Sequence, residues 1–273
     1  MNKIIGFIGG GNMAGAIIGG ILHSGLAPKE QILASDISSQ ALQSLKDRFD
    51  IQTAENNQET AQKAEILFLS VKPQFFPEVI AEIKDCIRED TLLVSIAAGQ
   101  SISAIEARFG RELHLVRAMP NTPALVGAAM SALCPNQHVS EAELAQVISI
   151  FESFGACEVM AETMIDTVVG VSGSSPAYVY LFIEAMADAA VADGMPRNQA
   201  YKFAAQSVLG SAKMVLETGM HPGALKDAVC SPGGTTIEAV AVLEEQGMRH
   251  AVIAAQRACV QKSKDMSKAN VPS

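Results

Sequence analysis

The chain has 273 residues, of which 49% are hydrophobic and 18% charged, with no tryptophan and a formal net charge of -9. This length allows two domains with buried cores, and this composition excludes an intrinsically disordered chain. Because 20 lysines and arginines stand against 29 acidic residues, an extended basic face is not available, and we expect neither nucleic acid nor a membrane as a partner.

The five cysteines are scattered along the chain and form no CxxC pair. A disulfide framework or a zinc site is therefore not expected, and reduced thiols in a cytoplasmic protein are the better interpretation. The five histidines have no metal-ligand spacing either. The sequence thus predicts a cytoplasmic protein with no metal.

The first segment, KIIGFIGGGNMAGAIIGGIL from Lys3 to Leu22, allows two interpretations. A signal peptide or membrane anchor needs an unbroken apolar stretch, of about 20 residues for a span. Three glycines and Asn12 interrupt the only candidate, which excludes that interpretation. The alternative is a buried strand, Ile4 to Ile8, then a glycine turn and a helix from Met13 to His23.

The spacing Gly9-x-Gly11-x-x-Ala14 in this turn is a dinucleotide-binding fingerprint with alanine in the third place. Gly9 permits the tight turn, Gly11 lets the backbone approach a pyrophosphate, and Ala14 allows the helix to pack closely on the strand. The free N–H groups at the helix start face the anion. A second strand ending LASD follows about twenty residues later, as the motif requires.

Strands and helices continue to alternate through the first part of the chain. The predicted strands are 31–35, 65–71, 92–97, 113–117, 128–133 and 156–160, and the predicted helices are 39–49, 77–87, 103–109 and 141–154. Near-continuous apolar strands between amphipathic helices indicate an α/β protein, with a doubly wound, mostly parallel Rossmann sheet over residues 1–160. Ligands bind at the carboxyl ends of such strands, which points to the turns VKPQ, AAGQ and RAMPNTP.

From residue 161 onward no strand is expected, and alanine-rich helices follow at 176–192, 197–218, 235–246 and 249–267. The segment Ala177–Ala192 is apolar nearly all round, so it must be buried. It is too short to span a bilayer, and a small domain has little interior in which to bury it. We therefore predict an all-α C-terminal dimerisation domain, residues 161–273, that forms an intimate homodimer.

The segment CSPGGTTIEAV, Cys230–Val240, places small residues at a helix start. Ser231 is the predicted N-cap and Pro232 is predicted in the first turn. Paired glycines leave backbone N–H groups uncovered, while Thr235 and Thr236 add hydroxyls. This pattern is typical of an uncharged receptor for a small carboxylate. An ordinary capped helix is the alternative.

No general acid or base stands near these motifs, since Tyr178 and Val179 follow SGSSPA and no lysine appears until Lys202. Reduction of a ketone would need such a group. Reduction of an imine depends less on a general acid, because the basic nitrogen enters the site already protonated. Positioning and desolvation then supply most of the acceleration. A β-hydroxyacid dehydrogenase, another imine reductase and a redox-sensing Rossmann protein are the competing interpretations.

Five segments resemble the pyrroline-5-carboxylate reductase family and together cover nearly the whole chain: GFIGGGNMAGAI, FLSVKPQ, RAMPNTP, SGSSPAYVYLFIEAMADAAVADGMPR and SPGGTTIEAV. The resemblance implies hydride transfer from NAD(P)H to the ring imine of 1-pyrroline-5-carboxylate, which gives L-proline in the last step of proline biosynthesis. It implies NADP as the cofactor, with NADPH preferred and NADH possible. It also implies an interlocked homodimer, in some members assembled into larger rings.

The resemblance assigns roles to individual residues. Thr236 would act as the catalytic residue by hydrogen-bonding and orienting the ring nitrogen. The substrate carboxylate would be held by the rest of the helix start: Ser231, Gly233, Gly234 and Thr235. The cofactor would contact a larger set, from the pyrophosphate loop through the adenosine end to the nicotinamide side: Gly9, Gly11, Asn12, Met13, Ala14, Ser35, Asn57, Val71, Lys72, Pro73, Ala97, Ala98, Gly99, Met119 and Asn121.

Cofactor preference stays open at the end of the second strand, Ser35-Asp36. A carboxylate there would bind the ribose diol of NAD and repel a 2′-phosphate. If Asp36 turned outward, Ser35, Ser38 and Asn57 would bind the phosphate instead. A further departure from the family resemblance is Ser175 before Pro176, where the family commonly has glycine, and it would narrow the pocket or alter the backbone there.

Overall fold

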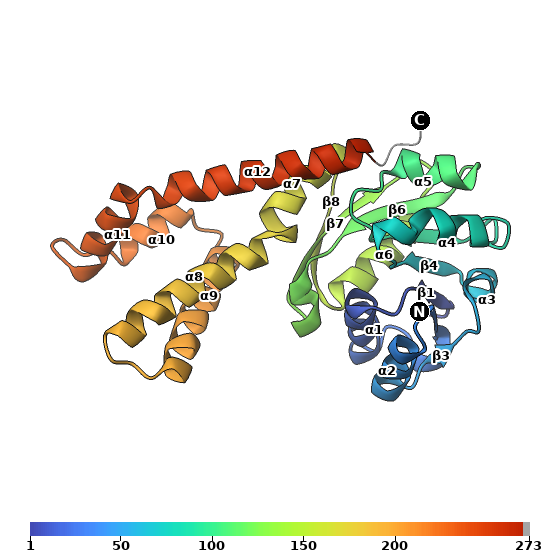
Figure 1. Cartoon of the computed structure of the whole chain (residues 1–273), viewed down its shortest axis with the longest axis horizontal. Helices are drawn as coiled ribbons and strands as arrows, with labels where there is room; N and C mark the ends of the chain where they lie inside the picture. The colour runs from blue at the N-terminus through green and yellow to red at the C-terminus, as the bar shows by residue number, and fades with distance from the viewer. Residues whose placement is uncertain (270–273) are drawn as a thin grey trace. The chain divides into compact units, whose positions relative to one another are not determined.

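The computed structural model describes residues 1–269 and contains two compact units (Figure 1). The first comprises Met1–Ser174 together with the segment from Cys259 onward, and the second comprises Ser175–Ala258. This division follows contacts within the chain and does not test a domain boundary, so the predicted boundary between residues 160 and 161 stays a prediction.

The first unit is built on an eight-stranded sheet in the order β3-β2-β1-β4-β5-β6-β7-β8 (Figure 1). The strands are β1 (Ile5–Ile8), β2 (Ile32–Ser35), β3 (Gln52–Thr53), β4 (Ile66–Leu69), β5 (Leu92–Ser95), β6 (His114–Met119), β7 (Ala129–Pro135) and β8 (Gly155–Val159). All neighbouring pairs are parallel except β6 and β7, which are antiparallel. The mostly parallel Rossmann sheet is therefore confirmed.

Helices cover both faces of this sheet, and each face has its own apolar core. The helices are α1 (Asn12–His23), α2 (Ser39–Phe49), α3 (Asn57–Lys63), α4 (Phe76–Ile83), α5 (Ile102–Phe109), α6 (Glu141–Glu152) and α7 (Ile165–Val168). Side chains alternate along β1, so Ile5 and Phe7 join the core under α1 and α6 while Ile8 joins the core under α4 and α5. The Phe7 ring stacks on Phe68 with 4.8 Å between centroids, and burying each such side chain stabilises the fold by about 1.5–3 kcal/mol.

The register of the central strands decides where a ligand can bind. Ile8 at the end of β1 lies beside Ser35 of β2 and Leu69 of β4, so the chain leaves all three strands at one level. Their three following loops therefore share one edge of the sheet, which is where parallel α/β sheets hold their ligands.

The second unit is helical. It contains α8 (Ser175–Ala192), α9 (Arg197–Thr218), α10 (Pro222–Ala228), α11 (Thr235–Glu245) and the first part of α12 (Met248–Ala269). The last part of α12 belongs to the first unit, where Ser263 Oγ donates to Asp166 Oδ1 at 2.6 Å. None of the helices in residues 1–269 is long and apolar enough to cross a membrane.

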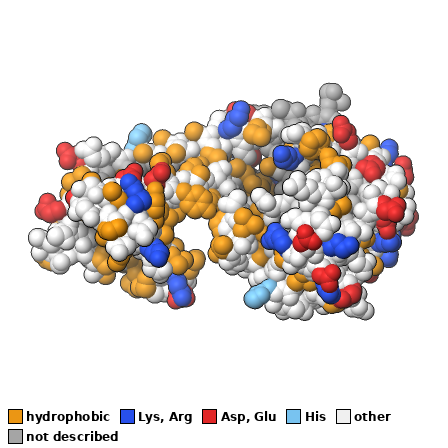
Figure 2. Space-filling model, turned by 60° about the horizontal axis from the view of Figure 1, so that its bottom comes forward, with side chains coloured by type: hydrophobic (Ala, Val, Ile, Leu, Met, Phe, Trp, Pro, Cys, Tyr) orange, Lys and Arg blue, Asp and Glu red, His pale blue; other side chains and the backbone are white. Residues whose placement is uncertain are grey.

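Helices α8 and α9 pack against each other but leave much apolar surface uncovered. Tyr180, Leu181 and Phe203 are 60%, 67% and 68% exposed, and Ala187 is the buried side chain of α8. Figure 2 shows such hydrophobic side chains at the surface. The apolar helix that the sequence predicts is present, and in the single chain it is not covered.

Candidate active site

The turn after β1 has a backbone that only glycine adopts without strain. Gly9 has φ +101°, and its N–H donates to the Ser35 carbonyl at 2.8 Å. A Cβ at this position would lie 2.8 Å from the backbone carbonyl carbon and oxygen of Ser70. Gly9 therefore permits both the turn and the close passage of β1 beside the end of β4.

The turn leads into a helix start that is open to an anion. Gly11 is the N-cap of α1, no side chain caps the helix, and its first turn has no acidic residue. A Cβ on Gly11 would meet no atom within 4 Å. Free N–H groups and the positive end of the helix dipole thus face an open cradle that any side chain would fill, which fits a dinucleotide pyrophosphate.

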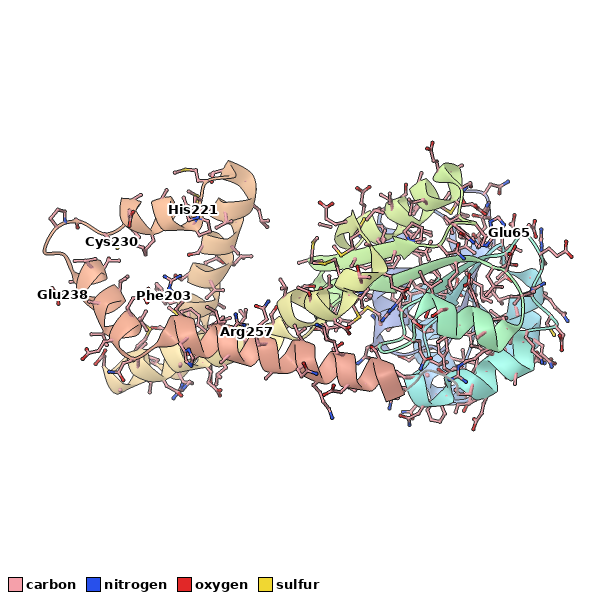
Figure 3. All side chains as sticks on the ribbon, turned by 90° about the horizontal axis from the view of Figure 1, so that it is seen from above. Glu65, Phe203, His221, Cys230, Glu238 and Arg257 are labelled. Carbon is pink, nitrogen blue, oxygen red and sulfur yellow. The ribbon has the colours of Figure 1, made fainter. Side chains whose placement is uncertain are left out.

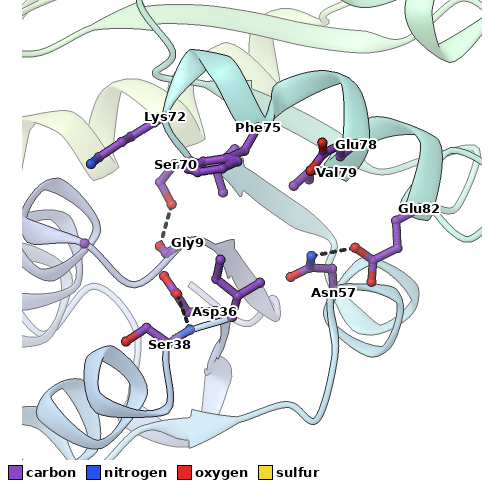
Figure 4. Close-up of a pocket in the computed structure, with 13 residues that line it drawn as sticks. Gly9, Asp36, Ser38, Asn57, Ser70, Lys72, Phe75, Glu78, Val79 and Glu82 are labelled. Carbon is purple, nitrogen blue, oxygen red and sulfur yellow. Dashed lines mark hydrogen bonds between the residues drawn. The ribbon is translucent and has the colours of Figure 1, made fainter.

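A cavity of about 370 Å³ adjoins this cradle (Figure 4). It is formed by the loops after β1, β2 and β4, the start of α3 and one face of α4. Its lining residues are Gly9, Gly11, Asp36, Ile37, Ser38, Asn57, Ser70, Val71, Lys72, Phe75, Glu78, Val79 and Glu82. The predicted cofactor residues Gly9, Gly11, Asn57, Val71 and Lys72 therefore come together from three separate parts of the sequence.

Four predicted residues of the first βαβ unit lie outside this cavity. Asn12 lines a neighbouring hollow, whereas Met13 packs against the core and Ala14 is 1% exposed, as close packing of α1 on the sheet requires. Ser35 is also 1% exposed, and its hydroxyl donates to Asn57 Oδ1 at 2.8 Å. Its side chain supports Asn57 from behind and does not face the cavity.

The remaining predicted cofactor residues follow β4, β5 and β6 along the same edge, beyond the cavity. Pro73 begins the turn after β4, Met119 ends β6, and the alanine–glycine turn after β5 contains Ala97, Ala98 and Gly99. Asn121 has both ends of its amide engaged: Nδ2 donates to the Ser172 carbonyl at 3.0 Å, and Oδ1 accepts from Met130 N–H at 3.0 Å. Asn121 thus holds two backbone segments together.

Several cavity residues were absent from the sequence prediction. Phe75, Glu78, Val79 and Glu82 present one face toward the cavity, and Glu82 Oε2 accepts from Asn57 Nδ2 at 2.7 Å. Their spacing of three and four residues is the signal that would have found them, since it marks one face of a helix placed directly after β4.

The second predicted site lies at the start of α11, and its capping differs from the prediction. The N-cap is Gly234, without a side-chain cap, so the assignment of Ser231 as N-cap and of Pro232 to the first turn is wrong. The cause is a tight turn: Gly233 has φ +67°, and Gly234 N–H donates to the Ser231 carbonyl at 3.0 Å. The turn ends the preceding loop, and the helix begins only at Thr235.

This correction leaves the helix start more open than predicted. Because no hydroxyl caps α11, its first backbone N–H groups are free to bind an anion. Thr235 is exposed and Thr236 half-buried, and both belong to the first turn. Cys230 precedes the turn, and Glu238 is the acidic residue in the first turn of α11 (Figure 3). Within residues 1–269 no group of three histidine, cysteine or acidic side chains is placed to hold a metal ion.

The fold and the open glycine loop define an NAD(P)H-dependent oxidoreductase with a Rossmann domain. Residues 4–99 match the family model described as NADP oxidoreductase, coenzyme F420-dependent, and residues 162–266 match pyrroline-5-carboxylate reductase dimerisation. The chain is 57% identical to the pyrroline-5-carboxylate reductase of Escherichia coli strain K12, over 98% of this chain and 100% of that relative. The chain belongs to the pyrroline-5-carboxylate reductase family.

Two solved structures extend this likeness to the fold. The pyrroline-5-carboxylate reductase of Coxiella burnetii superposes with a TM-score of 0.91 at 35% identity, covering 97% of this chain and 99% of that chain. The Plasmodium falciparum pyrroline carboxylate reductase with NADP bound gives a TM-score of 0.88 at 33% identity, covering 97% and 98%.

Proposed function

We propose that this chain catalyses the reduction of 1-pyrroline-5-carboxylate to L-proline by NAD(P)H, the final step of proline biosynthesis. The observation that carries the proposal is the 57% identity, over nearly all of both chains, to a relative of that name. NADP(H) is the cofactor, in keeping with the NADP bound in the Plasmodium structure. When bound, it supplies the hydride.

We assign the cofactor to the cavity and its glycine loop. The backbone of Gly11 and the first N–H groups of α1 bind the pyrophosphate, because the cradle there is open and uncapped. Asn57 is held from both sides by Ser35 and Glu82, which fixes its amide at the adenosine end. Lys72 is exposed, and we assign its backbone to the nicotinamide side. Pro73, Ala97, Ala98, Gly99 and Met119 extend that side along the sheet edge.

We assign the substrate to the start of α11. The free N–H groups after Gly233 and Gly234 bind the carboxylate, with Ser231 and Thr235 beside them. Thr236 hydrogen-bonds the ring nitrogen and holds the imine carbon in position for hydride. Its hydroxyl is too weak an acid to protonate the substrate, so it acts by orientation, which is sufficient for an imine that enters protonated.

The chain acts as a homo-oligomer. Several apolar side chains of α8 and α9, among them Leu181 and Phe203, are more than half exposed in one chain, and residues 162–266 match the dimerisation model. We propose a homodimer through this helical domain, residues 161–273, with the Rossmann domain in residues 1–160. We also propose that it acts in the cytoplasm, because all five cysteines are free thiols.

The test measures the oxidation of NADPH, monitored as the loss of its absorbance, with pyrroline-5-carboxylate and, separately, with 2-keto acids. We expect turnover of the imine only, and failure to reduce it would refute the proposed function. In Thr236→Ala we expect kcat/KM for the imine to fall at least about tenfold, the effect of losing one oriented hydrogen bond, or about 1.4 kcal/mol. Thr236→Ser should restore most of it because the hydroxyl returns.

Two controls locate this effect. Cofactor dissociation constants should be unchanged in Thr236→Ala, and a decrease in cofactor affinity would mean that Thr236 is wrongly placed. Thr218→Ala is the matched control, because Thr218 lies at the end of α9, where its hydroxyl donates to the Met214 carbonyl and accepts from Met220 N–H, both within four residues of it. Its kinetics should match those of the unmodified chain.

A further inference from the structure

The end of β2 places one carboxylate at the edge of the cofactor cavity. Asp36 Oδ2 accepts from Gly10 N–H and Oδ1 accepts from Ser38 N–H, both at 2.7 Å. Two backbone donors from two different loops therefore fix this carboxylate next to the glycine loop (Figure 4). Each oxygen keeps a free lone pair directed elsewhere, so the group can still accept hydrogen bonds from a ligand.

The neighbouring residue does not compete for this role. Ser35 is 1% exposed and donates its hydroxyl to Asn57, so it is unavailable to a ligand in the cavity. The arrangement in which Asp36 turns outward and Ser35 binds a phosphate is therefore not the one observed. Asp36 lines the cavity and Ser35 supports its wall.

The charges around Asp36 oppose a further anion. Three carboxylates line the cavity, from Asp36, Glu78 and Glu82, and Lys72 is the one cationic side chain among the lining residues in the described chain. Lys72 follows β4, and Figure 4 shows Gly9 and Ser70 between it and Asp36. A phosphate carries about 1.5–2 negative charges at neutral pH, so placing one beside Asp36 would bring like charges together.

We propose that Asp36 recognises the adenosine ribose of the cofactor. Its carboxylate accepts hydrogen bonds from the 2′,3′-diol of NAD(H) and disfavours the 2′-phosphate of NADP(H), so this residue sets the balance between the two donors. The inference rests on the dinucleotide site of the proposed function. The chain uses NADP(H), and Asp36 makes NADH a second effective hydride donor. The dissociation constants of the adenosine halves of NAD(H) and NADP(H) should therefore lie within about tenfold of each other.

One nearby cation defines the competing explanation. Arg48 lines the neighbouring hollow with Gly10, Gly11 and Ser38, and its guanidinium lies over the Phe49 ring, 4.7 Å from the centroid. If a 2′-phosphate were bound on that side, Arg48 rather than Asp36 would decide the preference. The experiment therefore includes both residues.

The test uses ADP-ribose and 2′-phospho-ADP-ribose in isothermal titration calorimetry with the full chain. In Asp36→Asn we expect the affinity for ADP-ribose to fall and that for the 2′-phosphorylated probe to rise, so that their ratio shifts about tenfold or more. Asp36→Ser is the second variant, in case loss of one loop contact loosens the turn, and urea unfolding checks that each variant is folded. Glu78→Gln removes another of the three cavity carboxylates. Because Asp36 is the carboxylate that Gly10 N–H holds beside the glycine loop, the ratio in Glu78→Gln should shift in the same direction but by less than threefold.

A shift of less than threefold in both Asp36 variants would overturn the inference, including the case in which both probes weaken equally. It would also be overturned if Arg48→Gln moved the ratio and the Asp36 variants did not. Because neither probe contains the nicotinamide, these results are independent of catalysis. Failure to reduce pyrroline-5-carboxylate with a normal ratio shift would refute the proposed function and leave the role of Asp36 intact.

Discussion

Two glycines of the cofactor loop, Gly9 and Gly11, are two residues apart and should respond oppositely to substitution. In Gly9→Ala the new methyl group is forced to a φ near +101° and to 2.8 Å from the Ser70 carbonyl group. Ser70 cannot easily move away, because its N–H and hydroxyl both donate to the Ile8 carbonyl at 2.9 Å. Backbone strain and overpacking together destabilise the fold by about 2–5 kcal/mol.

In Gly11→Ser, by contrast, the side chain enters open space at an ordinary φ of -74°. Serine is a better N-cap than glycine, so stability should be unchanged or higher by a few tenths of a kcal/mol. The hydroxyl would instead occupy the N–H groups that bind the pyrophosphate. Losing one hydrogen bond to a charged group weakens binding by about 1.5–3 kcal/mol, which is at least tenfold in the dissociation constant.

The measurements are urea unfolding for stability and calorimetric titration with NADP+ for binding. For Gly9→Ala we expect the free energy of unfolding to fall by about 2–5 kcal/mol, seen as a lower urea midpoint. For Gly11→Ser we expect normal unfolding with weakened binding. A stable Gly9→Ala protein, or a Gly11→Ser protein that binds normally, would refute this account of the loop.

Two further predictions concern ionisable groups of the first unit. Burial raises the pKa of Glu143, but hydrogen bonds from Ser140 and His114 outweigh this effect and leave the pKa below its usual value. The Glu143 carboxylate therefore stabilises the folded state above the unfolded pKa of about 4.3, and this stabilisation is lost as pH falls through the lowered folded pKa. The difference in unfolding free energy between the unmodified chain and Glu143→Gln should therefore shrink on acidification from about pH 5 to 3 in urea titrations, and a constant difference would contradict this. Burial raises the pKa of Cys134 to about 11, and the side chain is 1% exposed, so iodoacetamide should label it only after urea is added, as detected by mass spectrometry. Labelling of the native chain at neutral pH would show that the thiol is accessible.

Long periodic segments were predicted accurately. The helices Ser39–Phe49 and Arg197–Thr218 begin and end at the predicted residues. The two short helices α3 and α10, of seven residues each, were not predicted, since so few residues show little periodicity. For α3 a local signal was present, because Asn56 caps the helix by accepting from Glu59 N–H at 2.8 Å.

Errors in the site occurred where the backbone conformation, rather than residue type, decides. Serine followed by proline is a common helix start, but the left-handed turn at Gly233 makes Gly234 the N-cap of α11, while the predicted start at residue 235 is confirmed. Likewise, the sequence alone left open which of Ser35 and Asp36 would face the cofactor. Side chains alternate along a strand, so the answer depends on the register of β2 with its neighbours.

The sequence by itself determined the class of fold and the glycine loop, because these follow from local spacing and apolar periodicity, and it indicated the oxidoreductase family through the resemblance of five motifs. Only the tertiary structure decided that Asp36 and one face of α4 share the cavity, that Ser35 supports Asn57 from behind, and that both helix starts are uncapped. These facts depend on contacts between segments far apart in the chain. Strand register and loop conformation set such contacts, and a local pattern indicates only which face of an element is available for them.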